Sequence, residues 1–442
     1  MILSFNGIDL STGTYYKTGC DLEAFVEGLP APTPRNGHPA LPEKGVIDGI
    51  DAEKIEEAGW GLLYHERDRH LLEAARPLLA RRQNQARDLY RELVYREGES
   101  VSDFLFRQGI GMGEVNPRKV PFYLLILGDP HHIPFDFQCD LALVHAVGRL
   151  SFSTVDGYAR YARNVADYER NGPRTRRELL MCPMNNGDDL TELSRKELVF
   201  PLLQSLIDGG PERRGAWRPN SLSDCRRRNL IQKLSDETPD VLFTAGHGLC
   251  VSMDEVSRAK FQGSLVCNDW QASQAIAYDH CLSPADVAEM GGLDGMIGFL
   301  FACFSAGTPR FDSYAQKRRE LHRHAFVSPF AQALLQAGAL AVIGHVDQAY
   351  WHSFLWHDQV REIQHFSDTL SRLMAGRRVG TAMEPFGRRY ATISTLLAGR
   401  MFSPDPPPLE EIQLLGWLAF QDARQYVVLG DPAARLGYGS DT

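Results

Sequence analysis

The chain has 442 residues, 43% hydrophobic and 23% charged, which is the composition of an ordinary globular protein large enough for more than one domain. Its net charge of −9 provides no general basic surface, so we expect no nucleic acid partner. No apolar run approaches the ~20 residues of a membrane span, and the eight cysteines show no paired CxxC spacing, which argues against zinc ligation and a disulfide framework.

The N-terminal residues Met1 to Asp9 lack the basic stretch followed by an apolar stretch that marks a secretory signal. We therefore expect a cytoplasmic protein with reduced cysteines and no membrane contact. His131-His132 has no further ligands at metal-binding spacing, so we expect no metal and no cofactor.

The first part of the chain predicts a mixture of strands and helices. Strands are expected at residues 59–65, 122–127 and 142–148, and helices at 68–96 and 155–168. Asn171-Gly172-Pro173 predicts a domain boundary. We accordingly divide the chain into an N-terminal α/β region, 1–172, and a catalytic domain, 173–442.

From residue 173 onward, strand and helix patterns alternate, which is typical of a parallel sheet covered by helices. Ser283-Pro284 and Ser328-Pro329 each combine an N-cap serine with proline at the first helical position. The expected strands are 177–182, 240–245, 298–302, 339–346 and 426–429, and the expected helices are 192–207, 223–234, 284–290, 329–337, 360–374 and 381–397.

One four-residue sequence occurs twice. Leu127-Gly128-Asp129-Pro130 recurs as Leu429-Gly430-Asp431-Pro432, each time after an apolar strand. Two explanations stay open. Either the chain holds two related subdomains, the N-terminal one degenerate, or the two sites share the chemistry of one turn.

Two apolar segments end at residues that carry chemistry. Residues 240–245 lead into Gly246-His247-Gly248, and residues 298–302 lead into Cys303. Neighbouring parallel strands end at the same edge of a sheet, where a histidine base and a cysteine nucleophile can meet. A thiol with a pKa of ~8.5 needs such a base near neutral pH. The pattern predicts a cysteine peptidase with Cys303 as nucleophile and His247 as base. Cys250 lacks a preceding strand of its own and is the weaker candidate.

His247-Gly248 after one strand and Ala302-Cys303-Phe304-Ser305-Ala306-Gly307 after the next resemble the caspase-like clan (clan CD) of cysteine peptidases. Within it they are most similar to gingipain-type peptidases and bacterial CHAT-domain proteases. In caspases the histidine precedes the cysteine by ~50 residues, about as it does here. The resemblance implies a caspase-like three-layer sandwich, with a mainly parallel central sheet flanked by helices and preceded by the α/β N-terminal region. The caspase motif Q-A-C-[RQG]-G is reduced here to Ala302-Cys303, so a preference for aspartate before the cut is not implied.

By the same resemblance, the backbone N–H groups of Gly248 and Cys303 form the oxyanion hole. No orienting third residue is visible in the sequence. The resemblance also implies control by a protein partner or by processing, in a bacterial signalling or defence pathway. Caspase-like enzymes often place an activation loop where residues 316–324 lie, so Arg318, Arg319 and Arg323 are candidate self-cleavage sites. A solvated basic helix is the alternative.

In the clan, loops after the first strand and around the cysteine strand form the substrate pocket. Here these loops carry four carboxylates and two tryptophans, namely Asp188, Asp189, Asp312, Asp347, Trp351 and Trp356. Carboxylates in a partly buried pocket would favour arginine or lysine in the substrate. Solvated loop carboxylates are the alternative.

Three functions remain open. The leading hypothesis is a cysteine endopeptidase that cleaves protein substrates through a thioester acyl-enzyme. A non-catalytic caspase-like scaffold for protein interactions is the second. A cysteine-dependent acyltransferase is the third, and an apolar pocket that excludes solvent would favour it.

Overall fold

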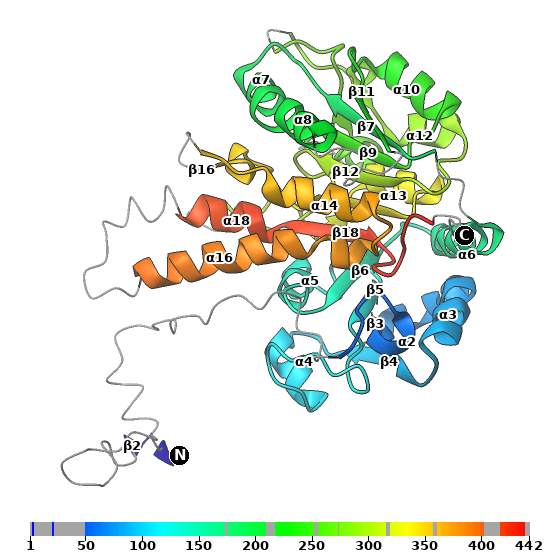
Figure 1. Cartoon of the computed structure of the whole chain (residues 1–442), viewed down its shortest axis with the longest axis vertical. Helices are drawn as coiled ribbons and strands as arrows, with labels where there is room; N and C mark the ends of the chain where they lie inside the picture. The colour runs from blue at the N-terminus through cyan, green and yellow to red at the C-terminus, as the bar shows by residue number, and fades with distance from the viewer. Residues whose placement is uncertain are drawn as a thin grey trace.

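The structure is a computed structural model that describes residues 2–3, 20–21, 49–172, 176–208, 217–251, 255–272, 274–314, 319–356, 360–401 and 416–437 (Figure 1). Its centre is a ten-stranded sheet in the order β4-β3-β5-β6-β18-β15-β12-β9-β7-β8. These strands are β3 (Trp60–His65), β4 (Tyr90–Tyr95), β5 (Tyr123–Leu127), β6 (Ala146–Leu150), β7 (Glu178–Pro183), β8 (Arg218–Ser221), β9 (Val241–Ala245), β12 (Ile297–Phe301), β15 (Ala341–His345) and β18 (Tyr426–Gly430).

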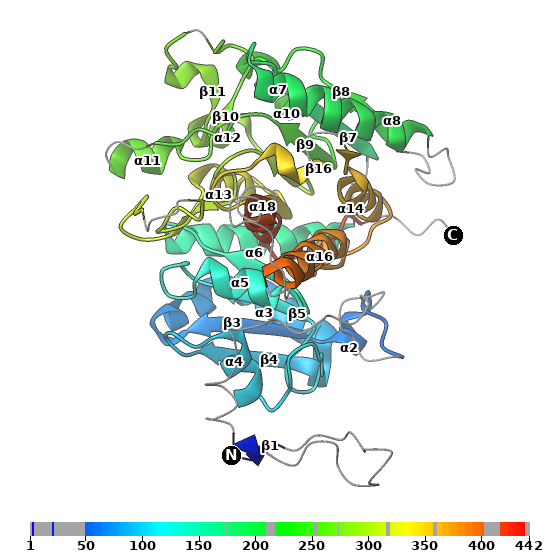
Figure 2. The ribbon, with the colours of Figure 1, turned by 90° about the vertical axis from the view of Figure 1, so that its left-hand side faces the viewer.

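Helices cover both faces of this sheet (Figures 1 and 2). One layer contains α3 (Leu72–Ala86), α6 (Val155–Asn171), α10 (Arg227–Asp236), α11 (Glu255–Phe261), α12 (Pro284–Met290) and α13 (Pro329–Gln336). The other contains α4 (Val101–Arg107), α5 (Phe135–Leu141), α7 (Asp189–Leu193), α8 (Phe200–Asp208), α14 (Gln364–Met374), α15 (Val379–Ala382), α16 (Glu384–Met401) and α18 (Leu418–Arg424). The expected α/β class, with a mainly parallel sheet between two helical layers, is confirmed.

Short elements complete the described part. They are α2 (Ile55–Ala58) and the two-stranded sheets of β1 (Ile2–Leu3) with β2 (Cys20–Asp21), β10 (Leu265–Val266) with β11 (Cys281–Leu282), β13 (Gly307–Thr308) with β14 (Phe326–Val327), and β16 (Leu355–Trp356) with β17 (Val360–Arg361). Within the described ranges, no helix is both long enough and apolar enough to cross a membrane.

The central strands are continuous apolar runs because helices cover them on both faces. Every residue of β5, β9, β12 and β15 is buried. β12 lies between β9 and β15, parallel to both, and Ile297 is aligned with Val241 and with Ala341. This register brings the C-terminal ends of β9 and β12 to the same edge of the sheet.

Three expected elements differ from the structure. The strand expected at 142–148 is formed by residues 146–150, and residues 360–361 at the start of an expected helix form β17 instead. The third difference is the largest. The helix expected over residues 68–96 ends at Ala86, and residues 90–95 form the edge strand β4, parallel to β3. Arg87, at the end of α3, has a φ of 52°, which breaks the helical path. The following Tyr90-Arg91-Glu92-Leu93-Val94-Tyr95 contains two tyrosines and a valine, residues that favour strands. Tertiary pairing with β3 thus overrides the leucine and charge spacing.

Strand β18, near the C-terminus, connects the two halves of the sheet. It pairs antiparallel with β15, and it also pairs with β6 at Val428–Gly148. A side chain at Gly148 would place its Cβ 2.2 Å from the carbonyl oxygen of Gly430, so only glycine allows this approach. The sheet therefore runs across the expected boundary at 172/173, and the division into two domains stays a prediction.

A buried ionic cluster fixes the turn after β18. The fully buried Arg82 of α3 donates from Nε to Asp431 at 2.6 Å. Its two terminal nitrogens form a bidentate salt bridge with Glu169 of α6. Trp60 Nε1 of β3 donates to the other oxygen of Asp431 at 3.0 Å. Burial opposes ionisation of Glu169, yet Arg82 lowers its pKa to about 2. The cluster joins β3, α3 and α6 to the C-terminal strand.

The repeated Leu-Gly-Asp-Pro sequences share one turn chemistry. In each, the aspartate Oδ1 accepts a hydrogen bond from the backbone N–H two residues later, His131 in the first copy and Ala433 in the second. Such side-chain turns are a common use of aspartate. Asp431 differs from Asp129 in that it also binds Arg82 and Trp60.

We predict that Asp431→Ala lowers the free energy of unfolding by about 3–5 kcal/mol, because it removes one partner of a buried ion pair and leaves Arg82 undercompensated. Chemical denaturation followed by circular dichroism measures this. Asp129→Ala is the matched control, since it removes the same turn but breaks no direct salt bridge among the described residues, as Asp431→Ala does with Arg82. Equal losses for the two variants would contradict this account of the cluster.

Candidate active site

His247 and Cys303 emerge from neighbouring strands at the same edge of the sheet. β9 ends at Ala245 and β12 at Phe301, and these two residues are paired. The ladder extends one residue further, since Gly246 N–H donates to Phe301 O at 3.1 Å. The predicted base and nucleophile therefore lie beside each other because of the parallel register.

The backbones of Gly248 and Cys303 are in direct contact. A Cβ on Gly248 would lie 1.9 Å from the carbonyl oxygen of Cys303 and 3.0 Å from its nitrogen. Real Cβ atoms do not approach backbone this closely, so any other residue would push the two loops apart. This contact explains the glycine that follows the histidine.

The N–H groups of Gly248 and Cys303 are free to bind a ligand. Gly248 faces Leu265 in an antiparallel bridge, and the two hydrogen bonds of that bridge join its flanking residues instead: Leu249 to Ser264 and Val266 to His247. At such a non-hydrogen-bonded position, the N–H points away from the partner strand. Among the residues that the structure describes, no acceptor is found for either N–H. Two adjacent unpaired donors are the arrangement that an oxyanion hole requires.

Asp188 orients the histidine. Nε2 of His247 donates to Oδ2 of Asp188 at 3.1 Å. Asp188 is itself fixed as the N-cap of α7, where its Oδ1 accepts from the N–H groups of Leu190 and Thr191 at 3.0 and 2.9 Å. Partial burial opposes ionisation, but the Thr191 N–H and His247 lower the pKa of Asp188 below its ordinary value. With Nε2 bound to Asp188, Nδ1 is the ring nitrogen left to take a proton.

This arrangement changes the interpretation of Asp188. Its place in the sequence predicts a residue of the substrate pocket, and no third catalytic partner is visible in the sequence. In the structure Asp188 lies against His247, the candidate base. A signal was present, since Asp188-Asp189-Leu190-Thr191 begins a helix with an N-cap aspartate, but its distance in sequence from His247 concealed the pairing.

The thiol of Cys303 is hydrogen-bonded to the backbone of the loop after β15 and not to His247. Its Sγ donates to the carbonyl oxygen of Ala349 at 3.7 Å, and no hydrogen bond joins it to His247 in the described part of the chain. Burial raises the pKa of the Cys303 thiol to about 11, and the nearby Asp347 adds to the effect. At neutral pH the thiol is therefore protonated. The seven cysteines whose side chains the structure describes are all free, and Cys250 is the exposed one among them.

The loops after β12 and β15 hold each other in place. Phe304 and Asp347 have φ values of 56° and 77°, unusual for residues other than glycine. Phe304 N–H donates to Asp347 O at 2.6 Å. The fully buried Asp347 carboxylate accepts from the N–H groups of Gln348 and Ser313, both at 2.9 Å. Asp347, expected in the substrate pocket, thus serves as an internal brace of these loops.

A cavity of about 260 Å³ opens between His247, Cys303 and α7. Trp351, which the sequence placed near the substrate, is part of its wall. The lining residues are Leu190, Thr191, Ser194, Gly246, His247, Phe301, Cys303, Gln348, Ala349, Tyr350, Trp351 and Phe354.

The remaining expected residues lie elsewhere. Asp189 is exposed on α7, and Asp312 accepts from Tyr314 N–H at 2.8 Å. Trp356 belongs to β16. Arg319 and Arg323 are exposed, and Arg318 is outside the described residues, so self-cleavage at these arginines stays a prediction.

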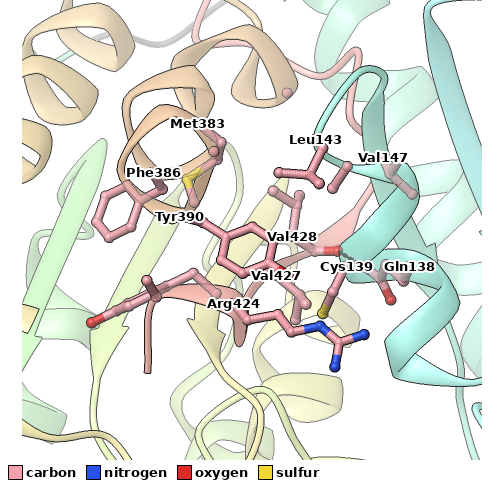
Figure 3. Close-up of a pocket in the computed structure, with 15 residues that line it drawn as sticks. Gln138, Cys139, Leu143, Val147, Met383, Phe386, Tyr390, Arg424, Val427 and Val428 are labelled. Atoms are coloured by element: carbon pink, nitrogen blue, oxygen red, sulfur yellow. Dashed lines mark hydrogen bonds between the residues drawn. The ribbon is translucent and has the colours of Figure 1, made fainter. Parts of the chain in front are cut away.

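A second cavity, about 40 Å³ in volume, lies between α5, α16 and β18 (Figure 3). Its walls are mostly apolar, as Leu143, Val147, Met383 and Phe386 show. Its one thiol, Cys139, has a pKa raised to about 12 by burial. No histidine lines this space, so it offers no second nucleophile–base pair. Across the ranges with described side chains, no cluster of three histidine, cysteine or carboxylate groups is arranged to hold a metal.

Comparisons with known proteins give likenesses of fold. No family model matches the chain, and no curated protein matches it in sequence. Among solved structures it is similar to a protease (11% identity, TM-score 0.49, 85% of this chain and 78% of that one). It is also similar to the Arg-specific cysteine proteinase gingipain R, with 12% identity and a TM-score of 0.47 over 86% of this chain and 78% of that one. A third similar structure is separase in complex with securin from Saccharomyces cerevisiae, with 12% identity and a TM-score of 0.36 over 70% of this chain but only 15% of that one.

We predict that Asp188→Asn lowers the catalytic rate by about 10- to 100-fold, because an amide stabilises the imidazolium of His247 less well than a carboxylate. Asparagine still caps α7, so the thermal unfolding temperature should change little. Turnover of a peptide substrate and thermal unfolding measure the two effects.

Asp189→Asn is the matched control, since it removes the same charge from the neighbouring exposed position. An Asp188→Asn enzyme as active as the Asp189→Asn enzyme would show that the carboxylate does not assist the base.

Proposed function

We propose that the chain is a cysteine endopeptidase in which Cys303 is the nucleophile and His247 the general base. The observation that carries the proposal is the convergence at one sheet edge. There His247 is hydrogen-bonded to Asp188, and Cys303 follows the end of the adjoining strand. The backbone N–H groups of Gly248 and Cys303 lie close together and have no acceptor among the described residues. This set supplies each group that acyl transfer to a thiol requires.

The chemistry follows from this geometry. The Cys303 thiol gives its proton to Nδ1 of His247, and the sulfur attacks the carbonyl carbon of the peptide bond. The carbonyl oxygen becomes an oxyanion that accepts from the N–H groups of Gly248 and Cys303. The imidazolium then protonates the leaving amine as the C–N bond breaks, which leaves a thioester. Water, deprotonated by His247, hydrolyses the thioester and restores the thiol.

Activation requires a change at Cys303. In the structure the thiol donates to Ala349 O, and its raised pKa keeps it protonated. Rotation of the side chain toward His247, together with a tighter approach of the imidazole, would create the reactive pair. We propose that a protein partner or processing promotes this change, so that the peptidase at rest reacts slowly with its substrates and with active-site probes, and faster once it is activated. The bacterial signalling or defence setting rests on the family resemblance alone and the cytoplasmic location on the sequence, and both stay predictions.

A second candidate is a cysteine-dependent acyltransferase. The observation that favours it is the aromatic and aliphatic lining of the cavity beside Cys303, which could hold an apolar acyl chain. The two functions differ in the acceptor of the acyl group, water or another nucleophile. By contrast, a non-catalytic scaffold that only binds other proteins would not require the hydrogen bond between Asp188 and His247.

Covalent labelling tests the proposed function. We predict that peptidyl acyloxymethyl ketones modify the wild-type protein at one site, detected by intact mass spectrometry, and that Cys303→Ala abolishes the modification. Cys250→Ala is the matched control, because Cys250 is the exposed cysteine nearest to the histidine in sequence. Labelling that survives in Cys303→Ala but disappears in Cys250→Ala would show that Cys250, and not Cys303, is the reactive cysteine.

The pH dependence of a small alkylating agent tests the resting state. Only the thiolate reacts, so a thiol whose pKa is raised to about 11 gains reactivity about tenfold per pH unit from pH 7 to 10. An ordinary thiol, with a pKa of ~8.5, levels off above about pH 9. We expect the first profile for iodoacetamide at Cys303, followed by mass spectrometry of the Cys303 peptide. A plateau below pH 8 would show that the thiol is already activated.

A further inference from the structure

We infer that the cavity beside Cys303 binds an uncharged, apolar side chain of the substrate, that of the residue whose carbonyl Cys303 attacks. The inference rests on the proposed function and names the substrate class of the same site. It replaces the arginine or lysine preference that the carboxylates of the sequence suggested.

The walls of the cavity are aromatic and aliphatic. Phe301 comes from the end of β12, and Tyr350, Trp351 and Phe354 come from the loop after β15. Leu190 of α7 faces the same space. The polar members, Thr191, Ser194 and Gln348, are uncharged. Apart from the catalytic pair, the described lining therefore carries no group that ionises near neutral pH.

The nearby carboxylates already have hydrogen-bond partners inside the protein. Asp188 accepts from the N–H groups of Leu190 and Thr191, from the Thr191 hydroxyl at 3.0 Å and from His247. Four hydrogen bonds fill the capacity of a carboxylate. Asp347 lies beneath the loops, where it binds two backbone N–H groups, and it is fully buried.

A third carboxylate lies behind the cavity wall. Asp422 of α18 is fully buried and accepts from Tyr350 N–H at 3.0 Å and from the Ser353 hydroxyl. The Ser353 hydroxyl also contacts the Tyr426 hydroxyl at 2.6 Å. Asp422 thereby fixes the segment that carries the aromatic wall, and none of these three carboxylates is left to pair with a substrate cation.

Charge and shape therefore favour the same class of side chain. A guanidinium or ammonium in this space would lose its hydration without gaining a counter-charge, which is costly. An apolar side chain would exchange water for aromatic surface, which is favourable. The wall is also formed in advance, since the loop after β15 is braced by Asp347 on one side and by Asp422 on the other.

A matched set of inhibitors tests the inference. The probes are tripeptidyl acyloxymethyl ketones that differ only in the side chain next to the ketone, which is leucine, phenylalanine, arginine or lysine. We expect the leucine or phenylalanine probe to label Cys303 of the full-length protein at least about tenfold faster than either basic probe. Labelling rates are measured by intact mass spectrometry, with Cys303→Ala as the blank.

Gln348→Glu is the decisive variant. It adds a carboxylate to the cavity wall with almost no change of shape, so the arginine and lysine probes should gain at least about tenfold relative to the apolar probes. Gln83→Glu makes the same substitution on the exposed surface of α3 and should leave the ratio unchanged.

The outcomes separate the two proposals. Faster labelling of Cys303 by the basic probes overturns the inference and leaves the proposed function intact. An unchanged probe ratio in Gln348→Glu also overturns it, because the cavity is then not the recognition pocket. Absence of Cys303-dependent labelling by all four probes counts against the proposed function and the inference together.

Discussion

The parallel register of β9 and β12 is the constraint on which the rest of the site depends. It aligns Ala245 with Phe301, so the chain leaves both strands at one edge of the sheet and places His247 and Cys303 on adjoining loops. The glycine at position 248 lets these loops touch, and the same contact places two unpaired N–H groups side by side. The positions of the proposed nucleophile, base and oxyanion hole thus follow from one alignment of strands together with the absence of a side chain at Gly248.

The same framework engages the Cys303 thiol away from His247. Burial gives the Cys303 thiol a raised pKa, and its hydrogen bond is to Ala349 O, in the loop that also forms the aromatic wall of the cavity. Asp422 of α18 and Asp347 hold that loop from opposite sides. Movement of α18 or of the segment at Ser313 would therefore reach the thiol and the substrate cavity together. This coupling offers a physical route by which a distant event could switch the site.

Several elements could be predicted from the chain because their patterns are local. β5, β9, β12 and β15 are apolar runs bounded by glycine or charge, and α12 and α13 begin with a serine N-cap followed by proline. The strand β4 was missed, since its residues continue the spacing of the helix before it and only pairing with β3 makes them a strand. The connection of both half-sheets through β18 was likewise beyond a local pattern, because β18 and β6 are far apart in sequence.

For the candidate active site, the sequence by itself singled out the two residues that are proposed to carry the chemistry. A histidine between glycines and a cysteine after an alanine each stood at a strand end, and strand ends meet at sheet edges. Only the tertiary structure decided what the carboxylates do. Asp188 turned toward His247, Asp347 turned inward to brace two loops, and the space beside Cys303 was left to aromatic side chains. The physical reason is that a carboxylate acts on whatever lies within hydrogen-bond reach, and packing, not spacing in the sequence, sets those neighbours.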